Sequence, residues 1–212
     1  MGGAIEADLD FSRLGACRHV CAFFRDDDES YRTLLPFIKE GFQRGHKAVH
    51  VVRPGQEGDH LHRLAAAGVD VAQSKDSGQL EVLRNTDVYL NDGRFDQDQM
   101  LQAFAERASG SVPGFPLSRI VCDMEWATSE PSVHDDLIEF EARANELWSQ
   151  HDDLVICVYN LSELSGEMVI DIMRTHPMVL IGNLLQENPF FTPPSQFLQE
   201  RRRKREAETV TA

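Results

Sequence analysis

Six short apolar runs rich in β-branched residues recur along the chain, and stretches with a helical pattern separate them. The runs predict strands at His19–Phe24, Lys47–Val52, Gln79–Arg84, Arg119–Asp123, Leu154–Tyr159 and Met178–Gly182. The predicted helices are Glu29–Arg44, Gly58–Ala67, Asp96–Ser109, His134–Gln150 and Glu163–Arg174. Continuous apolar strands that alternate with helices are typical of a parallel sheet buried on both faces. We therefore predict a three-layer α/β fold with a mostly parallel sheet.

Residues that begin and end helices stand near these boundaries. Glycines that suit a left-handed helix end follow three of the helical patterns, at Gly45, Gly68 and Gly110. Plausible N-caps are Asp28 or Ser30, Asp96 and Ser132. Pro36 lies well inside the first predicted helix, where it predicts a kink or a later start of that helix.

The junction between the first strand and the first helix is acidic. In nucleotide-binding α/β proteins this junction holds phosphate with glycines, backbone amides and a lysine. Here four consecutive acids, Asp26 to Glu29, occupy it, and the segment from His19 to Ser30 contains neither glycine nor lysine. Acidic side chains stabilise a helix N-terminus but repel a triphosphate. The pattern thus predicts a nucleotide-type scaffold without its phosphate site.

Composition predicts one globular domain. The chain has 212 residues, of which 42% are hydrophobic, and we divide it into a tail (1–16), a globular domain (17–192) and a helical basic tail (193–212). No apolar run approaches the ~20 residues that span a bilayer. The N-terminal residues show no signal-peptide pattern, so we expect a cytoplasmic protein with no membrane partner.

The net charge of −14 disfavours direct binding of nucleic acid, which depends on neutralising phosphates. The one basic run, Arg201 to Arg205, is expected to be a solvated helical tail. Contact of this run with nucleic acid or anionic lipid is the alternative.

The four cysteines, Cys17, Cys21, Cys122 and Cys157, form no CxxC pair, and we expect neither a zinc knuckle nor disulfides. His19 and Cys21 are two apart on a strand and leave the same face. With Cys122 and Cys157 they could form a metal-binding cluster of nitrogen and sulfur atoms. The favoured alternative is a core of small thiols with one hydrogen-bonded histidine.

The residues at the carboxyl ends of the strands are the candidate ligand-binding residues, because ligands of open α/β sheets bind there. They are Phe24, Arg25, Arg53, Asp123, Glu125, Trp126, Tyr159 and Asn160. Arginines, carboxylates and aromatic rings together suit a small amphipathic ligand. Arg25 and Arg53 either clamp an anionic ligand or balance the acids from Asp26 to Glu29.

Three further residues have alternative roles. Asp123 either fixes the rim of the pocket through loop amides, which we favour, or holds magnesium. Glu141 shares an apolar helix face with Leu137, Ala144 and Trp148, so it requires a partner, and an arginine or histidine from the sheet is expected. His176 precedes Pro177 at the amino edge of the sheet, where a structural capping role is favoured.

Common catalytic motifs are absent from the sequence. It contains no GxSxG elbow, HExxH motif, Rossmann glycine fingerprint or Walker lysine. Binding is therefore favoured over catalysis, and we predict no enzymatic activity and no cofactor.

The chain resembles the MEDS family, the methanogen/methylotroph DcmR sensory domain. The resemblance covers roughly residues 17 to 191. Its pieces are His19–Phe24, Gly68–Val71, Gly78–Val82, Asp123–Ala127, Phe140–Glu141, Cys157–Tyr159, His176–Pro177 and Asn188–Pro189. The family implies a RecA/KaiC-like sheet that has lost its phosphate-binding loop. In that strand order the Leu154 strand lies between the His19 and Arg119 strands, which predicts one pocket from Phe24, Arg25, Asp123, Trp126, Tyr159 and Asn160.

The resemblance also implies a sensory role for small organic molecules derived from hydrocarbons, in signal transduction and transcription regulation. We expect this chain to signal through a partner, since it carries no output domain; a histidine kinase, an anti-sigma factor and a transcription regulator stay open, as does a homodimer. One alternative is a degenerate RecA-like nucleotide-binding protein in which Asp123 or Glu125 handles magnesium. Another is a metal- or haem-based redox sensor, built on the buried polar group His19, Cys21, Glu141, Cys157 and His176. A third is an interaction scaffold.

Overall fold

The computed structural model describes residues 18–91, 94–108, 113–128 and 133–211, and within them the chain forms a seven-stranded sheet. The strands run in the order β3-β2-β6-β7-β1-β8-β9, and all neighbours are parallel except β8 and β9. These strands are β1 (His19–Phe24), β2 (Lys47–Val52), β3 (Leu80–Arg84), β6 (Ser118–Asp123), β7 (Leu154–Asn160), β8 (Met178–Ile181) and β9 (Leu184–Glu187). A separate two-stranded ribbon joins β4 (Leu90–Asn91) to β5 (Arg94–Phe95).

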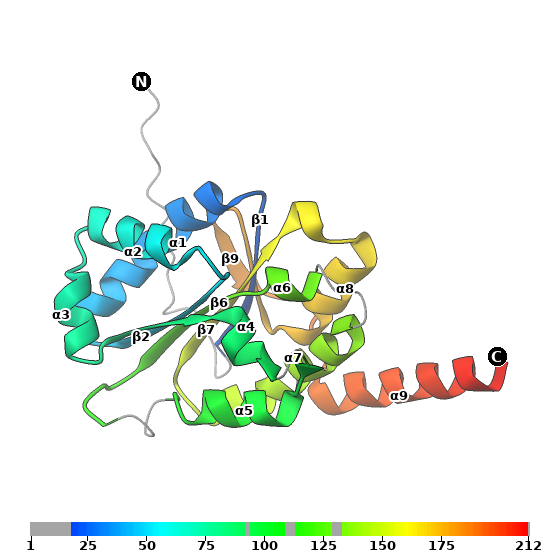
Figure 1. Ribbon diagram of the computed structural model, residues 1–212. Coiled ribbons are helices and arrows are strands. Elements are labelled where there is room, and N and C mark those ends of the chain that lie inside the picture. Colours follow the sequence, from blue (N-terminus) through cyan, green and yellow to red (C-terminus); the bar gives the residue numbers. More distant parts are fainter. Residues whose placement is uncertain (1–17, 92–93, 109–112, 129–132, 212) are drawn as a thin grey trace.

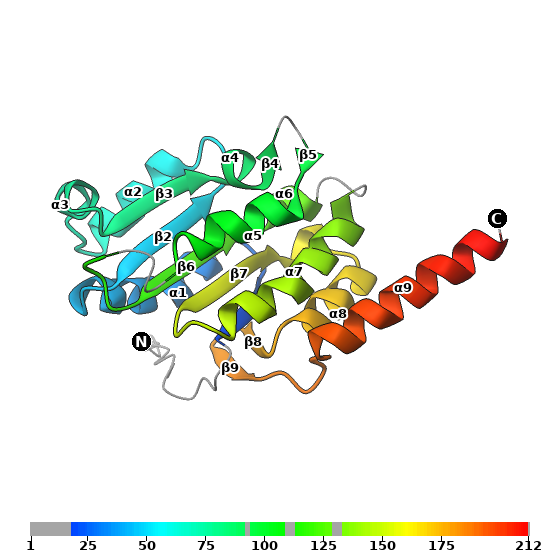
Figure 2. The same ribbon diagram turned by 90° about the horizontal axis from the view of Figure 1, so that it is seen from below.

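Helices cover both faces of this sheet, as Figures 1 and 2 show. One face carries α1 (Asp27–Gln43), α2 (Glu57–Ala66) and α3 (Val71–Asp76). The other carries α4 (Asn85–Tyr89), α5 (Gln97–Ala105), α6 (Glu125–Thr128), α7 (His134–Trp148), α8 (Gly166–Thr175) and α9 (Pro194–Thr211). The 3-10 turn η3 (Leu161–Glu163) follows β7. Each face has its own apolar core, so the predicted three-layer fold is confirmed.

The six predicted strands are confirmed to within a residue at their ends, and β7 lies between β1 and β6 as predicted. The sequence pattern missed β9, α3, α4, α6 and the β4–β5 ribbon. These elements are short, and the periodicity of so few residues is not distinctive.

Helix α1 differs from its prediction in two respects. It starts at Asp27, capped by Asp26 rather than by Asp28 or Ser30, because the Asp26 carboxylate accepts from Glu29 N at 2.8 Å. It also runs through Pro36 instead of starting after it. Pro36 lies on the exposed side of the helix, where water can bind the carbonyl group that a proline leaves without an amide partner. Gly45 and Gly68 take the predicted positive φ, and Asp96 caps α5; Cys17, Gly110 and Ser132 lie outside the described residues.

The C-terminal segment is attached to the body of the protein. Phe197 of α9 is fully buried, and the C-terminal end of this long helix extends past the body (Figure 2). Before it, the Asn188 side chain donates to the carbonyl oxygens of Met173 and His176, while Phe190 stays exposed. Among the described helices, none combines the length and apolar character needed to cross a bilayer.

Candidate functional site

A pocket opens at the carboxyl ends of β2, β6 and β7, on the face that α1 and α2 cover. It is lined by Asp27, Ser30, Tyr31, Leu34, Ile38, His50, Val51, Val52, Arg53, Gln56, His60, Val121, Asp123 and Val158. Its free volume is about 60 Å³. One water requires roughly 10–15 Å³ on this scale, so the pocket has room for a molecule of about four to six non-hydrogen atoms.

The floor of the pocket is apolar. Val121 and Val158 belong to the central strands β6 and β7, where full burial is the rule, yet both stay partly exposed. Helices α1 and α2 cover these two side chains only in part, and the remaining gap is the pocket. Apolar surface left open at the centre of a sheet is available to a ligand.

One wall carries a hydrogen-bonded chain of three polar side chains. Tyr31 OH lies 2.8 Å from His60 Nδ1, and His60 Nε2 lies 2.8 Å from His50 Nδ1. At the end of this chain, the buried Nε2 of His50 has no hydrogen-bond partner among the described residues. Burial lowers the pKa of His60 to about 4 and that of His50 well below its ordinary value, so both rings are neutral at pH 7. Sequence reasoning missed this chain, although a histidine inside the apolar run of β2 was a signal.

The opposite rim is held by Arg53 and three carboxylates. The guanidinium group of Arg53 contacts Asp27 at 2.5 Å, Asp123 at 3.0 Å and Glu125. Burial raises the pKa of Asp123 and of Glu125, although the nearby Arg53 works to lower both. Arg53 is thus surrounded by acids, and Arg25 pairs with Glu29 at 3.2 Å, as expected of arginines that balance carboxylates. Asp123 also accepts from the amide of Glu125 at 2.9 Å, which is the favoured rim-fixing role.

The loop that would hold phosphate is occupied by the protein's own side chains. The amide of Glu29 donates to Asp26, and the amide of Arg25 donates to Glu29 at 2.8 Å, in the manner of a capping box. A second hollow of about 10 Å³, enough for one water, lies beside the pocket. It is lined by Phe24, Asp26, Asp27, Ser30, Asp123, Glu125, Val158, Tyr159 and Asn160.

Of the single pocket predicted from the strand ends, Phe24, Asp123, Tyr159 and Asn160 line the small hollow, whereas Arg25 and Trp126 line neither cavity. Asp123 and Arg53 line the larger pocket, whereas Phe24 and Asn160 reach only the small hollow. Trp126 stacks on Tyr89 with ring centroids 4.7 Å apart and packs into the core of the other face. The Tyr159 side chain also turns to that face, because successive residues of a strand alternate sides. Arg25 lies in solvent, with its side chain 77% exposed.

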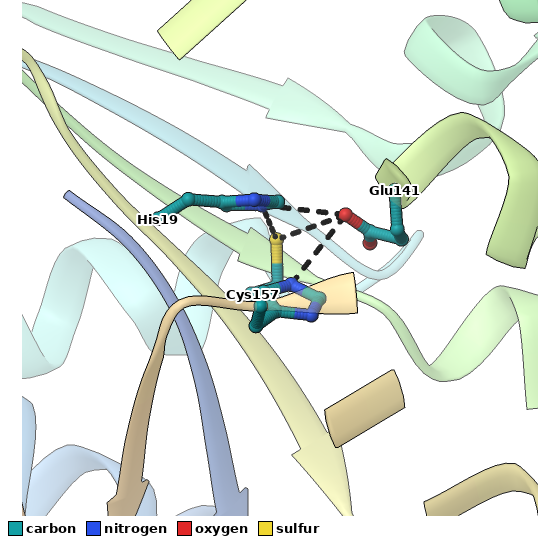
Figure 3. A group of neighbouring side chains, drawn as sticks. His19, Glu141 and Cys157 are labelled. Atoms are coloured by element: carbon teal, nitrogen blue, oxygen red, sulfur yellow. Dashed lines mark hydrogen bonds and ion pairs between the residues drawn. The ribbon is translucent and has the colours of Figure 1, made fainter. Parts of the chain in front are cut away.

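A second polar site is buried on the opposite face of the sheet. Four atoms converge there: His19 Nε2 of β1, Glu141 Oε2 of α7, Cys157 Sγ of β7 and His176 Nε2 at the end of α8. All four lie within 4.8 Å of one another, and each side chain is almost fully buried. Figure 3 shows His19, Glu141 and Cys157 pointing toward one another from their separate elements. We call these four residues the tetrad; they are the candidate metal ligands of the described residues.

Glu141 thus has the histidine partners that its apolar helix face required. Its Oε2 lies 3.3 Å from His19 and 3.5 Å from His176, and its Oε1 accepts from Tyr159 OH at 2.8 Å. Burial works to raise the pKa of Glu141, but the two histidines and Tyr159 outweigh it, so the pKa is lowered. Burial also lowers the pKa of His176 to about 3. Burial and the nearby charge of Glu141 both raise the pKa of Cys157.

The other cysteines lie nearby but outside the tetrad. Cys21 and Cys122 are the register neighbours of Cys157 on either side, and all three thiols belong to the same core. Cys21 Sγ contacts the carbonyl of Met178 at 3.5 Å. Only Cys157 among the described cysteines approaches the histidines. Of the predicted buried polar group His19, Cys21, Glu141, Cys157 and His176, the structure brings four residues together, and Cys21 lies outside the tetrad.

A family model, "MEDS: MEthanogen/methylotroph, DcmR Sensory domain", matches residues 18–177. The chain belongs to the MEDS family. The matched segment contains the whole tetrad, with His19 and His176 near its two ends, and all residues that line the pocket.

Among curated proteins, the chain is 24% identical over 164 residues to the transcriptional repressor DcmR of Methylorubrum extorquens. The alignment covers 74% of this MEDS chain and 57% of the repressor, so the chain spans a little over half the length of that relative. Both findings support a sensory or regulatory role.

Among solved structures, a KaiC-like protein from the hyperthermophilic archaeon Pyrococcus horikoshii OT3 is similar, with a TM-score of 0.53 at 11% identity. The likeness covers 78% of this chain and 70% of that protein. It shows that the MEDS chain has the predicted RecA/KaiC-like fold.

Proposed function

We propose that this chain is a non-enzymatic sensory domain that binds a small, uncharged hydrocarbon derivative in the pocket between α1, α2 and the strand ends. The carrying observation is the combination of an open apolar floor, Val121 and Val158, with the unpartnered nitrogen of His50. A ligand that places carbon or halogen atoms on the valines and one polar atom near His50 would satisfy both.

The net negative charge of the pocket rim supports an uncharged ligand. Asp27, Asp123 and Glu125 surround a single guanidinium group, so the rim carries more negative than positive charge and disfavours an anion. The same argument weakens the alternative of a degenerate nucleotide-binding protein. The helix N-terminus is also capped by Asp26, and its amides are not available to phosphate.

Signalling would pass through the two helices that form the pocket wall. Tyr31, Leu34 and Ile38 come from α1, and His60 comes from α2. A ligand that contacts both helices stabilises one arrangement of them and thereby shifts binding of a partner. Since a curated relative is a transcriptional repressor, we propose a transcription regulator or a protein that controls one as this partner.

The test is ligand-detected NMR on the purified chain with single small compounds: chlorinated one- and two-carbon alkanes, alcohols, ketones and amines. Val121→Phe fills the pocket from its floor without touching the rim charges. Ile181→Phe, at a half-exposed position on β8 outside the pocket, is the control. We expect binding of an uncharged compound that Val121→Phe reduces at least tenfold and Ile181→Phe leaves unchanged.

Three results would contradict the proposal. Binding that survives Val121→Phe in a folded protein would place the ligand elsewhere. Tight binding of ATP with magnesium that is lost on Asp123→Asn would favour the nucleotide alternative, and turnover of any compound would contradict the non-enzymatic role.

A further inference from the structure

The orientation of both tetrad histidines is fixed by hydrogen bonds on their far sides. Asn145 Nδ2 donates to the carbonyl oxygens of Glu141, Ala142 and Thr175, at 3.0, 3.3 and 2.6 Å. Its Oδ1 therefore faces His19 Nδ1, at 3.1 Å, and can only accept. His19 Nδ1 therefore carries a proton and donates it to Asn145, and Nε2 is the ring atom directed at the tetrad.

His176 is held in the same way. Its Nδ1 lies 2.9 Å from the carbonyl oxygen of Ile172, which accepts the ring proton. His176 Nε2 is then a lone pair, and this fully buried atom has no hydrogen-bond partner among the described residues.

The centre of the tetrad is therefore lined by potential metal-ligand atoms. Nε2 of His19 and Nε2 of His176 face the same carboxylate oxygen of Glu141, at 3.3 and 3.5 Å, and Cys157 Sγ lies 3.9 Å from that oxygen. Acceptors that face one another in a buried site repel unless a cation lies between them.

We propose that His19, Glu141, Cys157 and His176 bind one divalent transition-metal ion, with Zn²⁺ as the best fit, in a closed tetrahedral site. Four of the six distances between ligand atoms are 3.3 Å (His19 to Glu141), 3.4 Å (His19 to Cys157), 3.5 Å (His176 to Glu141) and 3.9 Å (Cys157 to Glu141), and all six are within 4.8 Å. Tetrahedral zinc with ordinary bond lengths requires ligand separations of about 3.3–3.6 Å.

Charge and supporting contacts agree with this assignment. A thiolate and a carboxylate neutralise the two charges of the ion, while the histidines bind as neutral rings, so the loaded site carries no net charge into the core. The binding step displaces one proton, from the Cys157 thiol to solvent. Asn145, Ile172 and Tyr159 orient the ligands from behind, as such contacts do in known metal centres.

This site is distinct from the ligand pocket. Cys157 and Val158 are successive residues of β7, so one side chain reaches the tetrad and the other forms the pocket floor on the opposite face. The metal site and the ligand pocket can be tested separately.

The experiment uses the full chain produced in minimal medium with added Co²⁺ or Zn²⁺, because a closed site is filled during folding. We expect one ion per chain after gel filtration, and a near-ultraviolet thiolate-to-cobalt band with the visible bands of tetrahedral Co²⁺. Cys157→Ala removes the near-ultraviolet band, whereas the matched control Cys21→Ala, equally buried at the neighbouring register position, retains it. Tyr159→Phe keeps the spectrum and lowers the metal affinity roughly tenfold.

X-ray absorption of the zinc-loaded wild-type chain tests the site without any variant. We expect one sulfur ligand at about 2.3 Å and three nitrogen or oxygen ligands at about 2.0–2.1 Å. A folded chain that contains no metal, a shell without sulfur, or a cobalt band that Cys157→Ala retains would each overturn the proposal.

Discussion

At the scale of single residues, Arg53 is the charge on which the rim of the pocket depends. It contacts Asp123 at 3.0 Å in a site where both side chains are about three-quarters buried. Arg84 and Asp87 are closer, at 2.7 Å, but both are half exposed, so solvent screens their attraction. Burial rather than distance therefore decides which pair stabilises the fold.

A double-mutant cycle tests this ranking. We expect Arg53→Gln and Asp123→Asn to couple by about 1–2 kcal/mol in the free energy of unfolding. Arg84→Gln and Asp87→Asn should couple by less than about 0.5 kcal/mol. Urea denaturation of the two single variants and the double variant provides both numbers. Equal coupling energies in the two cycles would show that solvent screens the Arg53–Asp123 pair as strongly as the exposed Arg84–Asp87 pair.

His60 makes stability depend on pH. Its pKa falls from 6.5 to about 4 on folding, because the ring is buried between Tyr31 and His50. The unfolded chain thus binds this proton more readily. The stabilisation is fully present above pH 6.5 and is lost as the pH falls toward 4, by up to roughly 3 kcal/mol.

We expect His60→Gln to flatten the fall in unfolding free energy between pH 6.5 and 4. His62→Gln is the control, since His62 lies exposed on the same helix. Chemical denaturation at half-unit pH steps measures the difference. Parallel pH profiles for His60→Gln and the wild-type chain would show that His60 is protonated in the folded state.

At the scale of elements, the buried Arg119 side chain requires a glycine at position 41 of helix α1. A Cβ atom at Gly41 would lie 2.7 Å from Cδ of Arg119. That arginine cannot move away, because its guanidinium group donates to Phe37 O at 2.5 Å, to Glu40 at 3.0 Å and to His46 at 3.1 Å. Helix α1 therefore passes close to β6 only with glycine at this position.

Two glycine-to-alanine substitutions are expected to have opposite effects. Alanine is favoured over glycine inside a helix by about 1 kcal/mol, and at Gly58 of α2 nothing lies within 4 Å of the new Cβ. Gly58→Ala should stabilise the fold by about 0.5–1 kcal/mol. Gly41→Ala should destabilise it by about 1–2 kcal/mol, since overpacking outweighs helix propensity. Thermal and urea unfolding of both variants would decide; a stabilising Gly41→Ala would mean that Arg119 can shift.

At the scale of the whole molecule, the basic run of the C-terminal helix is partly neutralised by the body. Arg201 pairs with Asp135 and Asp171, Lys204 with Glu167, and Arg205 with Glu139. These partners belong to α7 and α8, which also carry Glu141 and His176 of the tetrad. The predicted solvated tail is thus a helix docked by charge, and less of its positive charge is available for nucleic acid or lipid.

Removing one docking residue should loosen α9. Arg201 is mostly buried between two carboxylates, whereas Arg202 is exposed and makes no ion pair among the described residues. We expect Arg201→Ala to speed amide hydrogen exchange in the second half of α9 about fivefold, and Arg202→Ala to leave it unchanged. The difference should shrink in 1 M salt, where the screening length is roughly 3 Å. Equal exchange in both variants would show that Phe197 alone holds the helix.

Much of the fold and part of the site follow from the sequence alone. The six apolar runs predicted the sheet, because strands buried on both faces must be apolar throughout. The acids from Asp26 to Glu29 predicted a capped start of the first helix, since helix capping is a local effect. Glu141 on an apolar helix face predicted a buried partner, because burial of an unpaired charge is unfavourable.

Only the tertiary structure decided which distant residues meet. His19, Glu141, Cys157 and His176 come from four elements, and strand order and helix crossing bring their atoms together. Alternation along β7 sends Tyr159 and Cys157 to one face and Val158 to the other, which the strand-end rule does not resolve. The gap over Val121 and Val158 depends on where α1 and α2 cross the sheet. Sequence fixes the identity and periodicity of side chains, whereas packing between elements decides which of them share a site.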